Sequence, residues 1–318
     1  MGKYVNKMVL DSQKFALLCP GQASQKVGMC QDIYSNNSFA KEHIDLANEI
    51  LGYDVKNIMF EGPKELLTET IHTQPAIFIA SYIIGTLLIQ KGLIPTCIAG
   101  HSVGEISAYA IAKSLNFENG LKLVQFRAQA MHDVGKINSG SMAAVIGIKE
   151  KVLEDLCAKY SKGIVCVANY NSPSQAVISG DSNAIEDISP DILEAGALKV
   201  IKLNVSGAFH SPLMEEAKQD LKGFIENIKF SNPIFPIYSN ISATPVDNIN
   251  DIPQSLINQL ISPVLWYKII QEMISDGIKA GIEIGPGKVL QGLSKRINPA
   301  LNMYGAETHQ DIVNLNHV

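Results

Sequence analysis

A serine between two glycines stands at positions 100–104, where the sequence reads GHSVG. It follows a short apolar run, TCIAG at 96–100, and precedes the helical pattern VGEISAYAIAKSL. A strand, a tight turn and a helix in this order form a nucleophile elbow, because the glycines let the strand and the helix approach closely. The free N–H groups at the start of the helix then face any negative charge that develops on an acyl carbonyl. Ser102 is therefore the candidate nucleophile for covalent acyl chemistry.

A serine nucleophile needs a base, and His210 is the best placed of the seven histidines. It precedes Ser211 and Pro212, a pair typical of a helix start with a serine cap and a proline in the first turn. A helix N-terminus disfavours a charged imidazolium, so the ring would stay neutral and able to accept the serine proton. The alternative is a polar histidine beside a helix cap with no catalytic task, and the local sequence leaves both readings open.

An arginine lies on the apolar side of the helical pattern at 118–134. Arg127 follows Val124 by three residues and precedes Met131 by four, so it leans onto the buried face of that helix. A buried guanidinium needs an anion, because an unpaired buried charge is very costly. The anion is either a carboxylate of the protein itself or a substrate carboxylate held by two hydrogen bonds.

A glycine-containing turn, PGQASQ at 20–25, directly follows the apolar run KFALLC. Such a turn can supply a backbone N–H group to an oxyanion hole or bind a phosphate. It matches neither the dinucleotide-binding glycine pattern nor a phosphate-binding P-loop, so on its own it is a weak signal.

The elements that must position these residues form an α/β pattern. Short apolar runs alternate with longer helical patterns, which is typical of a mainly parallel sheet covered by helices. The expected strands are 14–19, 96–100, 235–239 and 279–285. The expected helices are 38–51, 75–91, 102–114, 118–134, 251–276 and 287–297. With the elbow after one of the strands, the pattern favours an α/β-hydrolase-like large domain with a parallel sheet.

The segment 137–207 follows a different pattern. Strand and helix signals occur there in the order β-α-β-β-α-β, which is the ferredoxin-like arrangement. We therefore expect a large catalytic domain made of 1–136 and 208–318, with 137–207 inserted as a small ferredoxin-like domain. The cleft between the two is the natural place for a site.

The composition argues against nucleic acid and membrane partners. Lysine and arginine total 26 against 31 aspartates and glutamates, a net charge of −5, with no basic tract for nucleic acid. The longest apolar stretch, 76–89, has about 14 residues, whereas a membrane span needs roughly 20, so a buried core helix is expected. The apolar run at 15–19 is too short for a secretory signal. Five widely spaced cysteines without a CxxC pair fit reduced thiols, and we expect a cytoplasmic protein.

Taken together, the motifs resemble those of the malonyl-CoA:acyl carrier protein transacylase family, which serves type II fatty acid synthesis. The resemblance rests on seven segments in the expected order and covers about 14–300. These segments are PGQASQKVGM, GHSVGE, LVQFRAQAM, VANYNSPSQAVISG, SGAFHSPLM, QLISPVLW and EIGPGKVLQGLSKRI. The first 13 residues and the tail after about Asn302 fall outside it.

The resemblance implies a catalytic pair rather than a triad. By this likeness Ser102 is the nucleophile and His210 the general base and acid. Gln259 matches the residue whose main-chain carbonyl orients the histidine, in place of the usual acidic third member. No metal and no bound cofactor are expected, since a CoA thioester is the substrate.

The resemblance also assigns the groups that hold the substrate. Arg127 would bind the free carboxylate of the malonyl group, and the backbone N–H groups of Gln22 and Val103 would form the oxyanion hole. Two positions depart from the family pattern: Ala23 replaces the usual glycine of GQGSQ, and Val103 replaces a frequent leucine. Neither changes the backbone group that would act. Phe209 resembles the malonyl-type rather than the methylmalonyl-type sequence of related acyltransferases.

The implied reaction is ping-pong transfer of a malonyl group from malonyl-CoA to the phosphopantetheine thiol of acyl carrier protein, through a malonyl ester on Ser102. We expect the enzyme to act as a monomer. Carrier proteins are strongly acidic, so a local basic patch is expected despite the negative net charge, although each cation could equally be an ordinary solvated side chain. The candidates are Lys288, Lys295 and Arg296, or Lys199 and Lys202.

Two other functions compete with this reading. An α/β-hydrolase-type esterase or thioesterase shares the GxSxG motif and would use an acidic residue between the serine and the histidine. Asp181 and Asp187 have that chain order, but both fall in the expected inserted domain. A non-catalytic module that binds carrier protein would need a broken catalytic pair, whereas Ser102 and His210 are both present.

Overall fold

The computed structural model describes residues 14–246 and 248–315, so the first thirteen residues lie outside the described part. Five parallel strands form one sheet in the order β7-β2-β1-β8-β9. The strands are β1 (Phe15–Cys19), β2 (Cys97–Gly100), β7 (Ile237–Tyr238), β8 (Ala280–Ile284) and β9 (Asn302–Ala306). The first four confirm the expected strands, and the parallel sheet confirms the α/β class.

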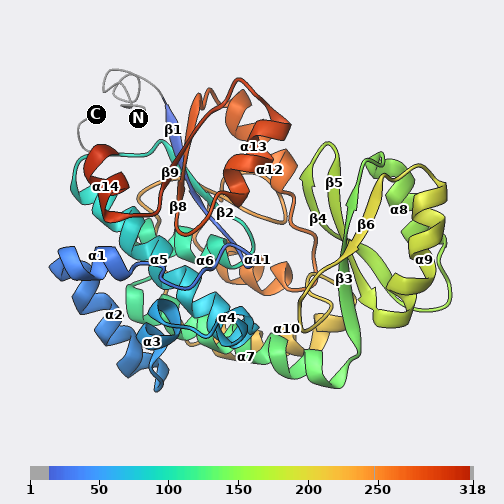
Figure 1. The fold of residues 1–318 in the computed structure, drawn as a ribbon, viewed down its shortest axis with the longest axis horizontal. Coiled ribbons are helices and arrows are strands. Elements are labelled where there is room, and N and C mark those ends of the chain that lie inside the picture. Colours follow the sequence, from blue (N-terminus) through green and yellow to red (C-terminus); the bar gives the residue numbers. More distant parts are fainter. Residues whose placement is uncertain (1–13, 247, 316–318) are drawn as a thin grey trace.

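Both faces of this sheet are buried, which explains why its strands read as continuous apolar runs. In β1, Leu17 points into the core formed with the helices α5 (Thr70–Gln90), α6 (Val103–Ile111) and α7 (Phe117–Ile137), and Leu18 points into a second core. Two further helices, α12 (Trp266–Ser275) and α13 (Val289–Ile297), cover that second face with Trp266 and Leu293. The sheet is therefore the middle of three layers, with the site motifs at the carboxyl ends of its strands (Figure 1).

Five of the six expected helices around the sheet are present, at 38–51, 70–90, 103–111, 117–137 and 289–297, whereas the helices at 31–36, 55–60, 64–68, 215–225 and 309–315 were not expected. Among them, α7 begins at an asparagine cap, where the Asn116 side chain accepts a hydrogen bond from the Asn119 N–H. In the large-sheet part of the chain the helices are α1 (Gln31–Asn36), α2 (Ser38–Leu51), α3 (Val55–Phe60), α4 (Lys64–Thr68), α5 (Thr70–Gln90), α6 (Val103–Ile111), α7 (Phe117–Ile137), α10 (Glu215–Ile225), α11 (Asp251–Gln259), α12 (Trp266–Ser275), α13 (Val289–Ile297) and α14 (His309–Leu315).

Helix α5 is the apolar segment that could be mistaken for a membrane span. By length and hydropathy it passes as a candidate span, but 78% of its most apolar window is buried inside the protein. It packs against α6 and α7 in the centre of the larger core. The expectation of a buried core helix is confirmed.

One expectation about the C-terminal part was wrong. The single helix expected at 251–276 is two helices, α11 and α12. Between them the backbone of Val264 bonds to strand β4 (Val165–Ser172), donating to Ala168 and accepting from Tyr170 at 2.9 Å each. The tail after Asn302, which lies outside the family resemblance, forms β9 and α14, and β9 pairs along β8.

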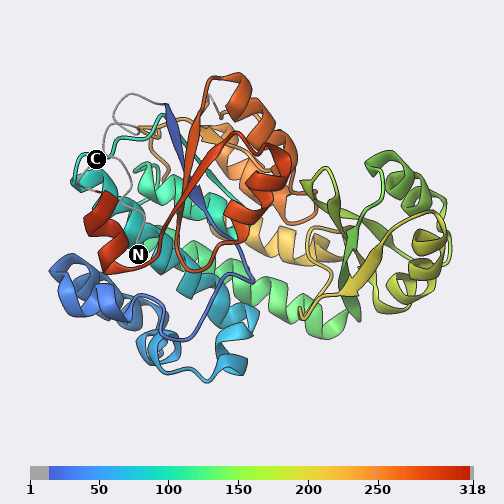
Figure 2. The same cartoon turned by 45° about the horizontal axis from the view of Figure 1, so that its top comes forward.

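The inserted segment forms a separate antiparallel sheet of four strands in the order β4-β5-β3-β6. Its elements are β3 (Gly140–Ile146), α8 (Glu150–Lys159), β4 (Val165–Ser172), β5 (Gln175–Asp181), α9 (Ser182–Glu194) and β6 (Lys199–Lys202). This is the expected order of strands and helices along the chain. Figure 2 shows the four-stranded sheet, with α8 and α9, standing to one side of the five-stranded one.

The two faces of the smaller sheet have different neighbours. Val145 and Ile178 pack against α8 and α9 in a core of their own. Met142, Ala144 and Val177 point the other way and line a cavity that the five-stranded part completes. The smaller sheet therefore supplies one wall of this cavity.

All five cysteines are free thiols in the structure. Four of them are buried, and burial raises the pKa of the partly exposed Cys166 thiol to about 11. The expectation of unpaired cysteines is confirmed, and none has the lowered pKa of a reactive thiol.

Candidate active site

Ser102 stands in a strained turn between β2 and α6. Its backbone has φ 53° and ψ −114°, a conformation that few residues other than glycine adopt. A Cβ atom on Gly100 would lie 1.9 Å from the carbonyl carbon of Gly104, and one on Gly104 would lie 2.3 Å from the carbonyl oxygen of Cys19. Both glycines are therefore required by close backbone packing, and the predicted strand–turn–helix elbow is confirmed.

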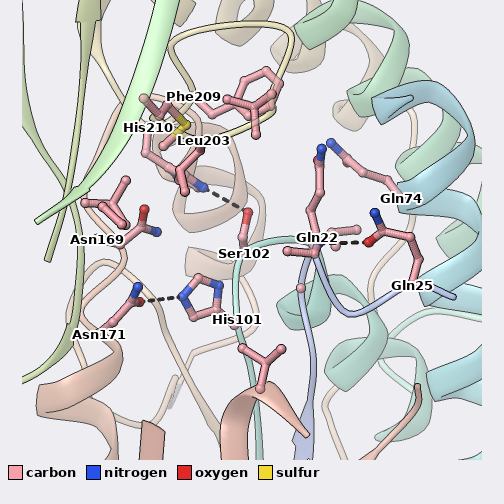
Figure 3. A pocket seen from close by; sticks show the side chains of 18 of the residues that line it. Gln22, Gln25, Gln74, His101, Ser102, Asn169, Asn171, Leu203, Phe209 and His210 are labelled. Carbon is pink, nitrogen blue, oxygen red and sulfur yellow. Dashed lines mark hydrogen bonds between the residues drawn. The ribbon is translucent and has the colours of Figure 1, made fainter. Parts of the chain in front are cut away.

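His210 lies beside the serine hydroxyl. Its Nε2 is 2.9 Å from Ser102 Oγ, and its Nδ1 is 2.8 Å from the main-chain oxygen of Gln259 (Figure 3 shows the contact between Ser102 and His210). Because a carbonyl oxygen can only accept, Nδ1 carries the proton and Nε2 is left to accept from Ser102. The expected cap is present, since Ser211 accepts from the Leu213 N–H at the start of the 3₁₀ turn η2 (Pro212–Met214).

The His210 ring is held neutral. Burial, and after it the positive charge of Arg127, lower its pKa to about 3, while the hydrogen bond to the Gln259 carbonyl opposes both. The sequence suggested a helix N-terminus as the cause, whereas in the structure burial and Arg127 come first. A neutral imidazole is the form that can take a proton from serine.

No carboxylate completes a triad at His210 among the described residues. Asp181 accepts from the Ile164 N–H at 2.6 Å, and Asp187 forms an ion pair with Lys162 at 2.9 Å. Both lie in the inserted segment and neither contacts the histidine. The site thus lacks the acidic member that the esterase alternative requires.

Arg127 is almost completely buried, at 1% exposure, and faces the nucleophile. Its Nη2 donates to Ser102 Oγ at 3.1 Å and to Gln259 Oε1 at 2.9 Å, and its Nη1 donates to Gln74 Oε1 at 2.6 Å. All three partners are neutral, its Nε has none, and no ion pair to Arg127 occurs within the described ranges. Burial lowers its pKa to about 10, which still leaves it charged at neutral pH, and Glu105 raises it. The protein thus supplies amides rather than a carboxylate directly to this cation.

Two backbone N–H groups near the serine have no acceptor. In the part of the chain that the structure describes, no hydrogen bond uses the N–H of Gln22 or of Val103. Val103 is the first residue of α6, and Gln22 lies in the turn after β1. Both residues line the same cavity as Ser102. Ala23, the next residue of the same turn, has φ 85°, the left-handed region that favours the glycine it replaces.

These groups open into one cavity of about 580 Å³. It lies between the carboxyl ends of the large-sheet strands and the smaller sheet (Figure 3). His101 points away from the serine hydroxyl and bonds Asn171 of β4 through its Nε2 at 2.9 Å. Phe209 and Leu203 form part of the apolar wall.

Sequence reasoning missed the polar residues behind the elbow. Asn240 accepts from the Ser102 N–H at 2.7 Å and donates to the Gly100 carbonyl at 2.6 Å, so it fixes both sides of the strained turn. Glu105 is fully buried and hydrogen-bonds the side chain of Gln259 at 2.6 Å. In the sequence, Asn240 is marked only by its place directly after an expected strand, and Glu105 only by its place one helical turn after the nucleophile.

The expected docking cations occupy two surfaces. Lys288, Lys295 and Arg296 are exposed around α13, whose Val289 and Leu290 line the cavity. Lys199 and Lys202 are exposed on β6, and Lys202 is paired with Glu186. Leu203, directly after Lys202, also lines the cavity, so both groups lie on elements that reach the site.

Comparison with known proteins places the chain in a family. The acyl transferase domain model matches residues 16–304. A malonyl CoA-acyl carrier protein transacylase from Bacillus subtilis is 38% identical over 290 residues, covering 91% of this chain and 92% of that protein. One from Haemophilus influenzae is 37% identical over 288 residues, covering 90% and 92%.

Solved structures of similar proteins superpose on this chain over nearly its whole length. The malonyl CoA-acyl carrier protein transacylase of Coxiella burnetii superposes with a TM-score of 0.92 at 34% identity, covering 95% of this chain and 96% of that one. A malonyl-transacylase solved in complex with its type II acyl-carrier protein gives a TM-score of 0.91 at 33% identity, covering 95% and 98%. With the site described above, these matches show that the chain is an acyltransferase and belongs to the malonyl-CoA:acyl carrier protein transacylase family.

Proposed function

We propose that this enzyme transfers the malonyl group of malonyl-CoA to the phosphopantetheine thiol of acyl carrier protein through a malonyl ester on Ser102. One observation carries this: the Ser102 hydroxyl contacts both a neutral histidine, at 2.9 Å, and a buried arginine, at 3.1 Å. The first contact supports nucleophilic attack, and the second supports selection of an acyl group with a free carboxylate. The names of the relatives point to the same substrate pair.

The reaction proceeds in two balanced halves. Ser102 Oγ attacks the thioester carbonyl while His210 Nε2 takes its proton, and the C–S bond breaks as that proton passes to the departing CoA sulfur. In the second half the carrier thiol gives its proton to His210 and attacks the ester, and Ser102 recovers the proton. The N–H groups of Gln22 and Val103 bind the oxyanion in both halves. The Gln259 carbonyl keeps the ring oriented.

Arg127 selects the acyl group. Its Nη2 and Nε lie on one edge of the guanidinium; Nη2 faces the serine hydroxyl and Nε is unpaired. A carboxylate can bind that edge with two parallel hydrogen bonds. A neutral acyl group would leave the cation without a charged partner in a desolvated site.

The carrier protein docks at the exposed cations around α13, next to the opening of the cavity. Charge reversal at Lys295 and Arg296 should raise the Michaelis constant for carrier protein and leave that for malonyl-CoA unchanged. Charge reversal at Lys199 and Lys202 is made for comparison, and the Michaelis constant for carrier protein is measured in the same way. An unchanged carrier constant in the first variant would dismiss this surface.

In this proposal the site is formed by two domains. The large hydrolase-like domain, 1–136 and 208–318, carries the catalytic pair, and the inserted ferredoxin-like domain, 137–207, closes one wall of the cavity. The order of strands in the two sheets supports this division. The proposal therefore assigns binding and chemistry mainly to the large domain.

The test is intact-mass spectrometry after brief exposure to malonyl-CoA without acceptor, with Ser102→Ala as the control. We expect a malonyl adduct on the wild type alone, discharged when carrier protein with its phosphopantetheine arm is added. Steady release of CoA without an adduct would instead indicate a hydrolase. Neither adduct nor release would indicate a module that only binds carrier protein.

A further inference from the structure

Glu105 is a buried acid that the reaction steps above do not use. It lies in the first turn of α6, three residues after the nucleophile, and is 0% exposed. Its Oε2 accepts from Gln259 Nε2 at 2.6 Å and from the main-chain N–H of Asn240 at 3.3 Å. Burying a carboxyl group is costly, so hydrogen bonds of this kind are needed to hold it there.

The side-chain amide of Gln259 is held at both ends. Its Oε1 accepts from Arg127 Nη2 at 2.9 Å, and its Nε2 donates to Glu105 Oε2 and, at 3.1 Å, to the main-chain oxygen of Ser102. A guanidinium offers only donors, and the groups at the other end are acceptors. Only one of the two amide orientations satisfies both ends, and Glu105 selects it together with the Ser102 main-chain oxygen.

We infer that Glu105 is a positioning residue for recognition of the acyl carboxylate and acts through the side chain of Gln259. Glu105 fixes the Gln259 amide so that its oxygen faces Arg127. That oxygen accepts from the guanidinium and holds it beside the Ser102 hydroxyl. Without Glu105 the Gln259 Nε2 keeps only the Ser102 main-chain oxygen as an acceptor, so the amide holds Arg127 less firmly in place. This inference rests on the proposed function, because it concerns the carboxylate of the malonyl group.

The base is separate from this linkage. His210 bonds the main-chain oxygen of Gln259, which does not rotate with the side chain. Loss of Glu105 should therefore impair recognition of a carboxylated acyl group more than attack by Ser102. If Glu105 only supported the fold, its loss would lower the acylation rates with carboxylated and neutral acyl groups equally. The two explanations therefore predict different results.

The experiment measures single-turnover acylation of Ser102 by malonyl-CoA and by acetyl-CoA, with thermal unfolding of each variant recorded beside it. In Glu105→Leu the ratio of malonyl to acetyl rates should fall by about tenfold, the size expected when a buried charged hydrogen bond is lost. Glu105→Gln should stay within about threefold of the wild type, because its amide oxygen can still accept from Gln259. In a Gln259→Leu background, Glu105→Leu should cause no further fall, since both act through one linkage.

Several results would overturn the inference. An unchanged ratio in Glu105→Leu would do so, and so would an equal loss with both substrates. Should Glu105→Leu not fold, Gln259→Leu decides the question, because it breaks the same linkage and leaves Glu105 in place; an unchanged ratio there also overturns the inference. A wild type that forms no malonyl adduct overturns the proposed function and this inference together.

Discussion

Replacing Arg127 by alanine tests the substrate assignment most directly. The guanidinium is 1% exposed, its hydrogen-bond partners are all neutral, and its Nε is unpaired. A malonyl carboxylate that enters this site loses its water and depends on Arg127 for its charge. Removing one partner of a buried ion pair costs about 3–5 kcal/mol. At 1.36 kcal/mol for each factor of ten, kcat/KM for malonyl-CoA should fall by roughly two to four orders of magnitude.

Acetyl transfer should respond differently, because an acetyl group has no carboxylate to lose its partner. We expect less than about a tenfold fall in kcat/KM for acetyl-CoA, because this substrate loses only the effect of the hydrogen bond between Arg127 and the Ser102 hydroxyl. Both values are measured as formation of the serine ester at limiting thioester. Arg296→Ala is the matched control, since it removes an exposed cation near the opening and should leave the malonyl-to-acetyl ratio unchanged. Equal losses with both thioesters in Arg127→Ala would refute the carboxylate role.

Other properties can be tested in the same way. The pKa of His210 is about 3 in the folded protein against a usual 6.5, so the unfolded chain binds one more proton between these pH values. The free energy of unfolding should therefore fall as the pH drops through this window. His210→Asn should reduce the slope of that free energy against pH by one proton, as measured in urea titrations at several pH values. Gly100→Ala should prevent folding or abolish acylation, because its Cβ would lie 1.9 Å from a backbone carbon, whereas Gly223→Ala, with open space around it, should fold normally by circular dichroism. Ala23→Gly should raise the stability by about 1 kcal/mol in thermal melts, since alanine is strained at φ 85°. Asn240→Ala should cost about 1–3 kcal/mol of stability and slow acylation, because the Ser102 N–H loses its acceptor; wild-type values for both would contradict its role at the elbow.

The sequence predicted local structure well where the signal is local. The elbow at 100–104 needs only a strand, two glycines and a helix, and these are neighbours in the chain. The period of α7 placed Arg127 on the buried face, because helical periodicity alone decides which side chains point inward. The same reasoning failed at 251–276, where a helical pattern continues through a segment that the smaller sheet holds in another conformation through Val264. It predicted no strand at β9, a short and partly exposed strand at the edge of the sheet.

What the sequence by itself determined is therefore the chemistry available: a serine, a histidine and an inward-facing arginine, with the parallel sheet that carries them. Only the tertiary structure decided which groups meet. Arg127 and Gln259 are 132 residues apart, and Ser102 and Asn240 are 138 apart, yet each pair is hydrogen-bonded. The sequence left open whether a protein carboxylate or a substrate would satisfy Arg127, and the structure surrounds it with amides. Partners of this kind depend on the packing of distant elements, which no local pattern of residues encodes.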